Sequence, residues 1–241
     1  MTKLIKHLAM WTILVCASTA FAGTFNVSTP TGSTAGGQPV DASATFTTSA
    51  GTLDITIFNN LANPTSIIQN VSDLFFSLSG VTSGILASST GNEIFVAADG
   101  TTSAGGSGVS TGWVLSISGG VFHLDGLNTA ADVPAHTIIG APDGSGVYSN
   151  ANNSITGNGP HNPFLESGAT FEITDAAITA DTIVSGVIFS FGTASGTNVP
   201  GNNAPDSGST LMLLGIGLAI CEFGRRAFTG RLGVAKLPTR S

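Results

Sequence analysis

The stretch DASATFTTSAGTLDITIFN, residues 41–59, decides the fold class that we assign to this chain. Its second half alternates between two sets of side chains, Leu53, Ile55 and Ile57 in one set and Asp54, Thr56 and Phe58 in the other. Alternation with a period of two is typical of a strand with one buried face. A short Ser-Ala-Gly link separates residues 41–48 from residues 52–59, so the stretch predicts a β-hairpin.

Short runs rich in β-branched and aromatic residues recur along the rest of the chain, between clusters of Gly, Asn, Asp and Pro. They predict further strands at residues 73–79, 93–98, 112–118, 120–124, 169–174 and 182–191. Residues 125–163 contain many turn residues and no long helical period, so we expect loops there. The length of 241 residues suits a single domain. The sequence therefore predicts an all-β fold, an antiparallel β-sandwich or jelly-roll-like domain over residues 23–199.

The distribution of charge excludes one large class of partner. The 7 basic residues all lie near the ends of the chain: Lys3, Lys6, Arg225, Arg226, Arg231, Lys236 and Arg240. Of the 14 acidic residues, only Glu222 lies outside residues 23–207, which leaves 13 carboxylates in a stretch without lysine or arginine. We expect no binding of nucleic acid, because phosphate contacts need basic side chains. A carboxylate buried in this stretch needs hydrogen-bond donors or a metal cation instead.

The N-terminus has the three parts of a signal peptide. Two lysines precede an apolar run over residues 8–15, and Ala20 and Ala22 form a cleavage site of the Ala-x-Ala type. We therefore expect residues 1–22 to be a signal helix that signal peptidase removes, so that the mature chain begins at Gly23. An uncleaved anchor and a lipoprotein are the alternatives.

The C-terminal region has turn residues, an apolar helix and basic residues in that order. We divide it into a linker with a turn-rich motif, a hydrophobic helix and a basic cytoplasmic tail: residues 200–210, 211–224 and 225–241. Its most apolar run, residues 211–221, would be roughly 16 Å long as a helix, whereas the hydrocarbon core of a bilayer is about 30 Å thick. Such a helix is short for a permanent span. Arg225 and Arg226 are the expected stop-transfer residues, held on the cytoplasmic side.

The motif Pro205-Asp206-Ser207-Gly208, followed by a Gly-rich hydrophobic helix and the arginine pair, resembles the VPDSG-CTERM relative of the PEP-CTERM sorting signals. The resemblance covers residues 204–226, with Ala204 where the family has Val. It implies that a membrane-bound exosortase recognises Pro205, Asp206, Ser207 and Gly208, cuts nearby and passes the protein to the cell surface. The body of the chain loosely resembles exported PEP-CTERM-type proteins without an assigned activity. The alternative for this region is a permanent tail anchor.

Three patterns in the expected β-domain are candidates for chemistry. Residues 108–112 match G-x-S-x-G, but the strand before the serine and the helix after it, which a hydrolase needs, are not predicted. The three histidines of this region are too far apart in sequence to form a metal-binding pair on one helix, so a zinc site would require the fold to bring them together: His123, His136 and His161. Glycoside cleavage would require two carboxylates facing each other, drawn from Asp125, Asp132, Asp143, Glu166, Glu172, Asp175 and Asp181.

Calcium is the ligand that the composition favours, because calcium prefers oxygen ligands and the stretch offers carboxylates without competing basic side chains. Asp143-Gly144-Ser145-Gly146 begins like an acidic calcium loop, but the later ligands of an EF-hand are missing. We expect no catalytic site and no cofactor beyond this calcium hypothesis.

Together, these patterns predict an exported protein of the cell surface or extracellular matrix. We expect a non-enzymatic structural or polysaccharide-associated component, with a secreted carbohydrate-active enzyme or a tail-anchored envelope protein as the alternatives. The expected partners are signal peptidase and exosortase during export, extracellular polysaccharide afterwards, and the membrane, transiently, through the C-terminal helix.

Overall fold

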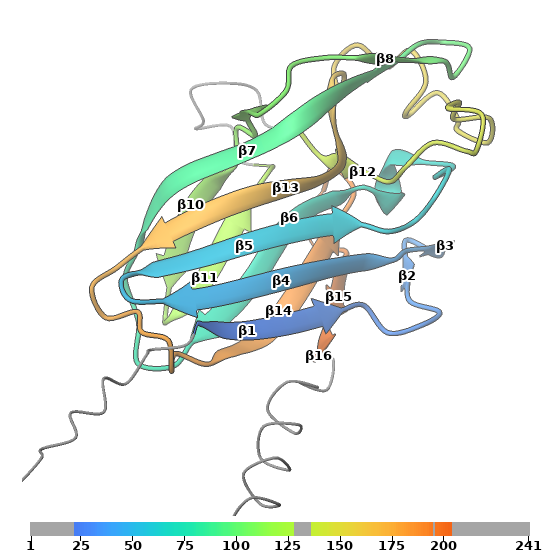
Figure 1. The fold of residues 1–241 in the computed structure, drawn as a ribbon. Helices are drawn as coiled ribbons and strands as arrows, with labels where there is room; N and C mark the ends of the chain where they lie inside the picture. The colour runs from blue at the N-terminus through green and yellow to red at the C-terminus, as the bar shows by residue number, and fades with distance from the viewer. Residues whose placement is uncertain (1–21, 128–135, 195, 204–241) are drawn as a thin grey trace, which may run out of the picture.

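The computed structural model describes residues 22–127, 136–194 and 196–203, which form an almost purely β-stranded structure (Figure 1). Its elements are the strands β1 to β16 and one short 3-10 turn, η1 (Ile67–Gln69), and these ranges contain no α-helix. A 14-stranded mixed sheet contains every strand except β2 (Thr34–Ala35) and β3 (Gln38–Pro39), which pair with each other. The prediction of an all-β fold is confirmed.

One half of the large sheet lies in front in Figure 1, and we call it the front layer. Its strands, in spatial order, are β7 (Ile85–Val96), β13 (Phe164–Thr174), β5 (Thr52–Asn59), β4 (Ala42–Ser49), β1 (Gly23–Ser28) and β16 (Asn202–Asn203). Two short strands, β8 (Thr102–Ala104) and β9 (Val109–Ser110), pair with β7. All pairings within the front layer are antiparallel.

The other half, which we call the rear layer, lies behind the first in Figure 1. Its strands, in spatial order, are β10 (Val114–Ser118), β11 (Val121–Asp125), β6 (Val71–Leu78), β14 (Val184–Phe191) and β15 (Asn198–Pro200). The two layers are continuous through β12 (Ile138–Ile139), which pairs antiparallel with β6 and parallel with β13. The sheet is therefore mixed, and the prediction of a wholly antiparallel sheet is wrong at this strand.

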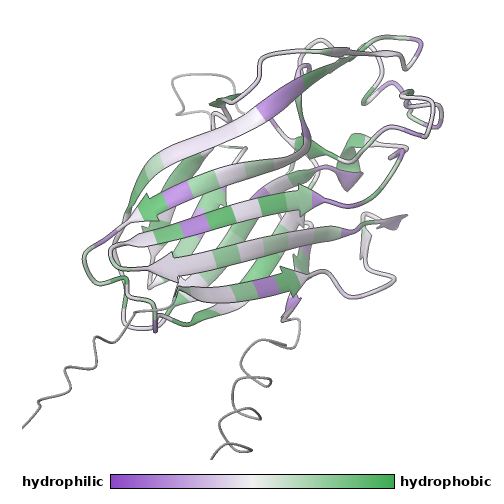
Figure 2. Ribbon diagram, viewed as in Figure 1, coloured by the Kyte–Doolittle hydropathy of each residue, from purple (hydrophilic) through white to green (hydrophobic). Residues whose placement is uncertain are grey.

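The hydrophobic core fills the space between the two layers. The rings of Phe46 on β4 and Phe76 on β6 meet edge to face, with centroids 5.3 Å apart. Trp113, just before β10, packs against Phe171 on β13 with centroids 5.1 Å apart. Apolar and polar positions alternate along the front strands (Figure 2). Each layer therefore has one apolar inner face and one outer face, as period-two patterning requires.

The hairpin predicted from residues 41–59 is confirmed as β4 and β5. The ladder runs from Ala42 opposite Asn59 to Ser49 opposite Thr52, and Gly51 in the turn has a φ of 81°, which favours glycine. On β5, the apolar residues Leu53, Ile55 and Ile57 are buried, at 0–1% exposure. The alternate residues face outward: Asp54, Thr56 and Phe58.

The other predicted strands are confirmed as parts of β6, β7, β10, β11, β13 and β14. The largest difference concerns β7, which begins at Ile85 rather than at residue 93. Its first half, ILASSTGN, is rich in small polar residues and lacks a clear period. Pairing with β13 keeps this segment extended, so tertiary contacts rather than local preference determine it.

The structure also extends past the predicted end of the domain. The boundary predicted at residue 199 falls within β15, and β16 continues to Asn203, where it pairs with β1. The described residues contain no helix long and apolar enough to cross a membrane. Most of the signal peptide, the hydrophobic helix of residues 211–224 and the basic tail lie outside the described ranges.

Candidate functional site

Several acidic side chains in the described ranges accept hydrogen bonds from hydroxyl groups and backbone amides. Asp143, in the loop after β12, shows this most fully. Its Oδ1 accepts hydrogen bonds from the Ser145 amide (2.9 Å), the Ser145 hydroxyl (2.6 Å) and the Val147 amide (3.1 Å). Its Oδ2 accepts one from the Ser149 hydroxyl (2.7 Å). These donors, the Ser145 hydroxyl first, hold the pKa of Asp143 well below its usual range.

The loop at Asp143–Gly146, whose sequence begins like a calcium site, is therefore a turn in which the Asp143 carboxylate accepts hydrogen bonds from the residues that follow it. Two further turns follow the same rule. Asp99 accepts hydrogen bonds from the hydroxyl and the amide of Thr101, and Asp175 accepts them from the Ser83 hydroxyl and the Ala177 amide. Hydrogen bonding lowers the pKa of both carboxyls, chiefly through the hydroxyls of Thr101 and Ser83. Both carboxylate oxygens of Asp143 already accept hydrogen bonds. Calcium binding at Asp143 stays a prediction.

A second type of contact joins a histidine to a carboxylate beside the short strand β12. His136 Nε2 lies 3.6 Å from Glu93 Oε1, and both side chains are largely buried. The His136 carbonyl accepts a hydrogen bond of 2.7 Å from the Trp113 indole. Burial lowers the pKa of His136, and the Glu93 carboxylate opposes that shift. The backbone and the side chain of His136 thus both contribute to packing.

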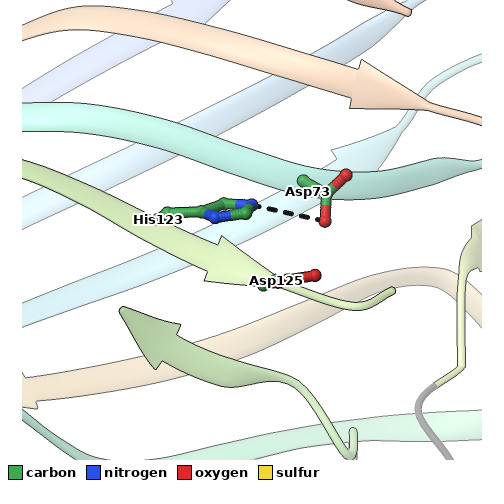
Figure 3. A group of neighbouring side chains, drawn as sticks. All are labelled: Asp73, His123 and Asp125. Atoms are coloured by element: carbon green, nitrogen blue, oxygen red, sulfur yellow. Dashed lines mark ion pairs between the residues drawn. The ribbon is translucent and has the colours of Figure 1, made fainter. Parts of the chain in front are cut away.

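The third group differs from these because two of its buried polar atoms lack hydrogen-bond partners. Asp73 lies on β6, and His123 and Asp125 lie on the neighbouring strand β11 (Figure 3). Asp73 is directly opposite Asp125 in the antiparallel ladder, and one potential ligand atom from each of the three side chains lies within 4.8 Å of the others. These side chains alternate with the core residues Leu74 and Leu124, which places them on the outer face of the rear layer. We call this group the Asp73–His123–Asp125 cluster.

Neighbouring groups orient each member of the cluster. The Ser72 hydroxyl donates a hydrogen bond of 3.1 Å to Asp73 Oδ2, and the Leu127 amide donates one of 2.9 Å to Asp125 Oδ1. The Phe75 ring stacks on the His123 imidazole, with centroids 3.9 Å apart and planes 12° from parallel. The three side chains are therefore held in place by contacts outside the cluster.

The two innermost polar atoms of the cluster face each other. Asp73 Oδ1 and His123 Nε2 are buried, and neither has a hydrogen-bond partner among the described residues. They are 3.5 Å apart, and the exposed fractions of the two side chains are 4% and 23%. A strong N–H to O hydrogen bond spans about 2.7–3.2 Å, so this contact is longer than one. The dashed line in Figure 3 marks it.

The structure does not bring the three histidines together, so the hypothesis of a three-histidine zinc site is wrong. His123 lies beside Asp73, His136 lies beside Glu93, and His161 lies in the loop before β13. Within the described ranges, the Asp73–His123–Asp125 cluster is the group of three or more ligands that is close enough to hold a metal ion. Sequence reasoning missed Asp73, although an aspartate inside the apolar run of β6 was a usable signal.

The G-x-S-x-G match has no elbow geometry in the structure. Ser110 is an exposed residue of β9, and the chain continues through the buried Thr111 into β10. The Thr111 hydroxyl accepts a hydrogen bond from the Trp113 amide. The strand-to-helix turn that would present a nucleophile is absent from this described segment.

The other predicted site residues are scattered. Glu172 lies on β13 opposite Asp54, on the outer face of the front layer, and Asp181 is exposed in the loop before β14. Ala22 is exposed immediately before β1. The remaining predicted residues lie outside the described ranges: Ala20, Asp132, Pro205, Asp206, Ser207, Gly208, Arg225 and Arg226.

A groove of about 280 Å³, open to solvent, crosses the outer face of the front layer over β5, β13 and β7. Its lining combines an aromatic ring with polar side chains: Phe58, Asn92, Glu166, Thr56, Thr90 and Thr170. Phe58 is 44% exposed, which is high for a phenylalanine. Sequence reasoning gave no sign of this groove, because its residues come from three strands distant in the chain.

An irregularity of the sheet shapes the groove. The register between β13 and β7 shifts between Leu165 and Ala169, and Ser167 within this bulge has a φ of 60°. A side chain at Gly168 would meet the Ile57 carbonyl oxygen at 2.7 Å, so glycine is required there. The bulge therefore interrupts the ladder between β13 and β7 at residues that line the groove. A non-glycine residue with positive φ often marks a functional site.

Comparison of the chain with protein-family models, with curated proteins and with solved structures yields no match.

Proposed function

We propose that this chain is an exported surface or extracellular-matrix protein whose β-domain binds polysaccharide without cleaving it. The groove at Phe58 is the observation that carries this proposal. One face of a sugar ring consists of C–H groups, which pack on an aromatic ring, while its hydroxyls need polar partners. The groove offers a half-exposed ring beside amide, carboxylate and hydroxyl groups, from Asn92, Glu166 and three threonines.

Binding rather than cleavage fits the carboxylates of this face. The groove lining contains one carboxylate, Glu166, whereas glycoside hydrolysis uses a pair on either side of the scissile bond. Asp54 and Glu172 are opposite each other on the same outer face, but neither lines the groove. We therefore propose a non-enzymatic structural or polysaccharide-associated role.

Delivery to the cell surface rests on the two terminal segments of the sequence. We propose that signal peptidase cuts after Ala22 and that an exosortase cuts near Pro205–Gly208, with the hydrophobic helix in the membrane only until then. Both positions lie next to the folded domain, because β1 begins at Gly23 and β16 ends at Asn203. Removal of both segments would leave every described strand intact. For the domain itself we propose the β-sandwich or jelly-roll class, supported by two facing layers and their shared core.

The function is tested by measuring retention of the protein on extracellular polysaccharide, together with the release of reducing ends. We expect retention without release. Phe58→Ala should weaken binding about tenfold, equivalent to about 1.4 kcal/mol, because the sugar loses its apolar contact. Phe95→Ala is the matched control, since Phe95 is equally exposed at 43% but does not line the groove. Sustained release of reducing ends, or equal binding by both variants, would contradict the proposal.

A further inference from the structure

We propose that the Asp73–His123–Asp125 cluster binds a divalent first-row transition-metal ion, such as Zn²⁺, on the outer face of the rear layer. The site is independent of the proposed polysaccharide groove, which lies on the outer face of the other layer. Its metal class also differs from the calcium that composition alone favours, because one of its three ligands is an imidazole nitrogen.

The first argument is the unpartnered carboxylate oxygen. The Asp73 side chain is only 4% exposed, and its Oδ1 has no hydrogen-bond partner among the described residues. A buried carboxylate without donors or a cation is costly, because it has lost its water. Asp99, Asp143 and Asp175 accept hydrogen bonds from serine or threonine hydroxyls and from backbone amides. Asp73 has a hydroxyl donor on Oδ2 only, and its Oδ1 points towards His123.

The second argument is the distance between the two facing atoms. Asp73 Oδ1 and His123 Nε2 are 3.5 Å apart, which exceeds a good hydrogen bond. Two ligands of a tetrahedral zinc ion, each bound at about 2.1 Å, are separated by about 3.4 Å. The observed separation therefore suits two atoms that bind the same ion.

The third argument is the placement of Asp125. It lies directly opposite Asp73 on the neighbouring strand, where like charges destabilise a ladder. The described ranges contain no lysine or arginine that could neutralise the pair. A divalent cation would balance the two carboxylates, with a neutral imidazole as the third ligand.

The surroundings support a preformed site. Ser72 orients Asp73, the Leu127 amide orients Asp125 and the Phe75 ring fixes the imidazole plane. Contacts of this kind position ligands before a metal binds. The His123 side chain is 23% exposed on the outer face, while its Nε2 and Asp73 Oδ1 are buried. Three protein ligands leave the fourth position of a tetrahedral ion for water.

The test uses the full chain, purified in detergent, stripped with a chelator and then titrated with Zn²⁺ and, separately, with Co²⁺. We expect a single ion to bind, a rise in the melting temperature with Zn²⁺, and visible Co²⁺ absorption of the intensity typical of four-coordinate nitrogen and oxygen ligands. His123→Gln and Asp125→Asn should each lower the affinity by more than about tenfold.

The matched controls are His136→Gln and His161→Gln, which change the histidines outside the cluster and should bind as the wild type does. Circular dichroism establishes that each variant is folded. If a cluster variant fails to fold, the Co²⁺ spectrum and the zinc-dependent melting temperature of the wild type still decide the question. Absence of Zn²⁺ and Co²⁺ binding at millimolar ion, binding unchanged in folded His123→Gln, or binding of Ca²⁺ alone would each overturn the proposal. A folded cluster variant that loses metal binding but is still retained on polysaccharide would show that the metal site and the groove act independently.

Discussion

At the residue scale, hydroxyl groups and backbone amides donate the hydrogen bonds to carboxylates that lysine and arginine donate in most proteins. Asp143 accepts four hydrogen bonds from its own loop, and two of them come from serine hydroxyls. Buried amides behave similarly: Asn59 donates from Nδ2 to the carbonyls of Gln69 and Ile138, which ties β5 to the junction at β12. Local polar contacts therefore fix the loops of a domain without lysine or arginine.

The lowered pKa of Asp143 predicts a loss of stability in acid. A carboxyl whose folded pKa lies below its usual value of 3.8 stabilises the fold above that pH, and the contribution disappears as the pH falls through the folded pKa. We expect the melting temperature of the wild type to fall between about pH 4 and about pH 2. Asp143→Asn, which cannot titrate, should lose less over the same interval.

Thermal unfolding followed by circular dichroism measures this difference. Asp181→Asn is the control, because Asp181 is exposed and has no hydrogen bond among the described residues, so its pH dependence should match the wild type. Equal acid sensitivity of Asp143→Asn and Asp181→Asn would show that the Asp143 turn does not contribute.

At the scale of elements, the short strand β12 joins the two layers. Ile138 and Ile139 are fully buried, and Gly140 follows them where the backbone of Leu61 passes. The Tyr148 hydroxyl donates a hydrogen bond of 2.7 Å to the Gly140 carbonyl. The junction thus depends on close backbone contact as well as on strand pairing.

Gly140→Ala should destabilise the domain by about 3 kcal/mol, because its Cβ would overlap the Leu61 carbonyl oxygen. Gly144→Ala lies in the same loop with nothing within 4 Å of the added carbon, and should change stability by less than about 0.5 kcal/mol. Urea unfolding of both variants measures the difference. Similar midpoints for the two would contradict the proposed role of the junction.

Period-two patterning could predict some of these elements and not others. The alternation in β5 is strong enough to indicate its face as well as its bounds, because one side of it meets the core. β12 has only two residues, both buried, and so carries no period; the first half of β7 is extended only because β13 lies beside it. For the same reason, only part of the Asp73–His123–Asp125 cluster could be predicted. The sequence indicates His123 and Asp125 as candidate ligands, but only the pairing of β11 with β6 brings Asp73 beside them.

At the scale of the whole molecule, the folded domain fits between the two proposed cleavage positions. Gly23 is the first residue of β1 and pairs with Thr48, and Asn203 is the last residue of β16. A cut inside either strand would remove part of the sheet. The proposed processing removes both terminal segments and leaves every strand of the sheet intact.

Intact mass of the protein recovered from the cell surface tests this processing. We expect a form that begins at Gly23 and ends between Pro205 and Gly208. Substitution of Asp206 by alanine should leave the C-terminal segment attached, because the recognition motif is changed, while the cut after Ala22 is unaffected. A surface form that retains residues 211–241 in the wild type would instead support a permanent tail anchor.

The position of β13 has a consequence for the order in which the chain folds. β13 lies between β5 and β7, although both precede it in the sequence by many residues, and its pairing brings Ile173 opposite Leu53. Until β13 arrives, β5 and β7 each present an unpaired edge, which is the kind of surface that associates with other chains. Closing such distant pairs is slow. We therefore expect the insertion of β13 to be a late, non-local step of folding, and the chain to be most prone to aggregation before residues 164–174 are in place.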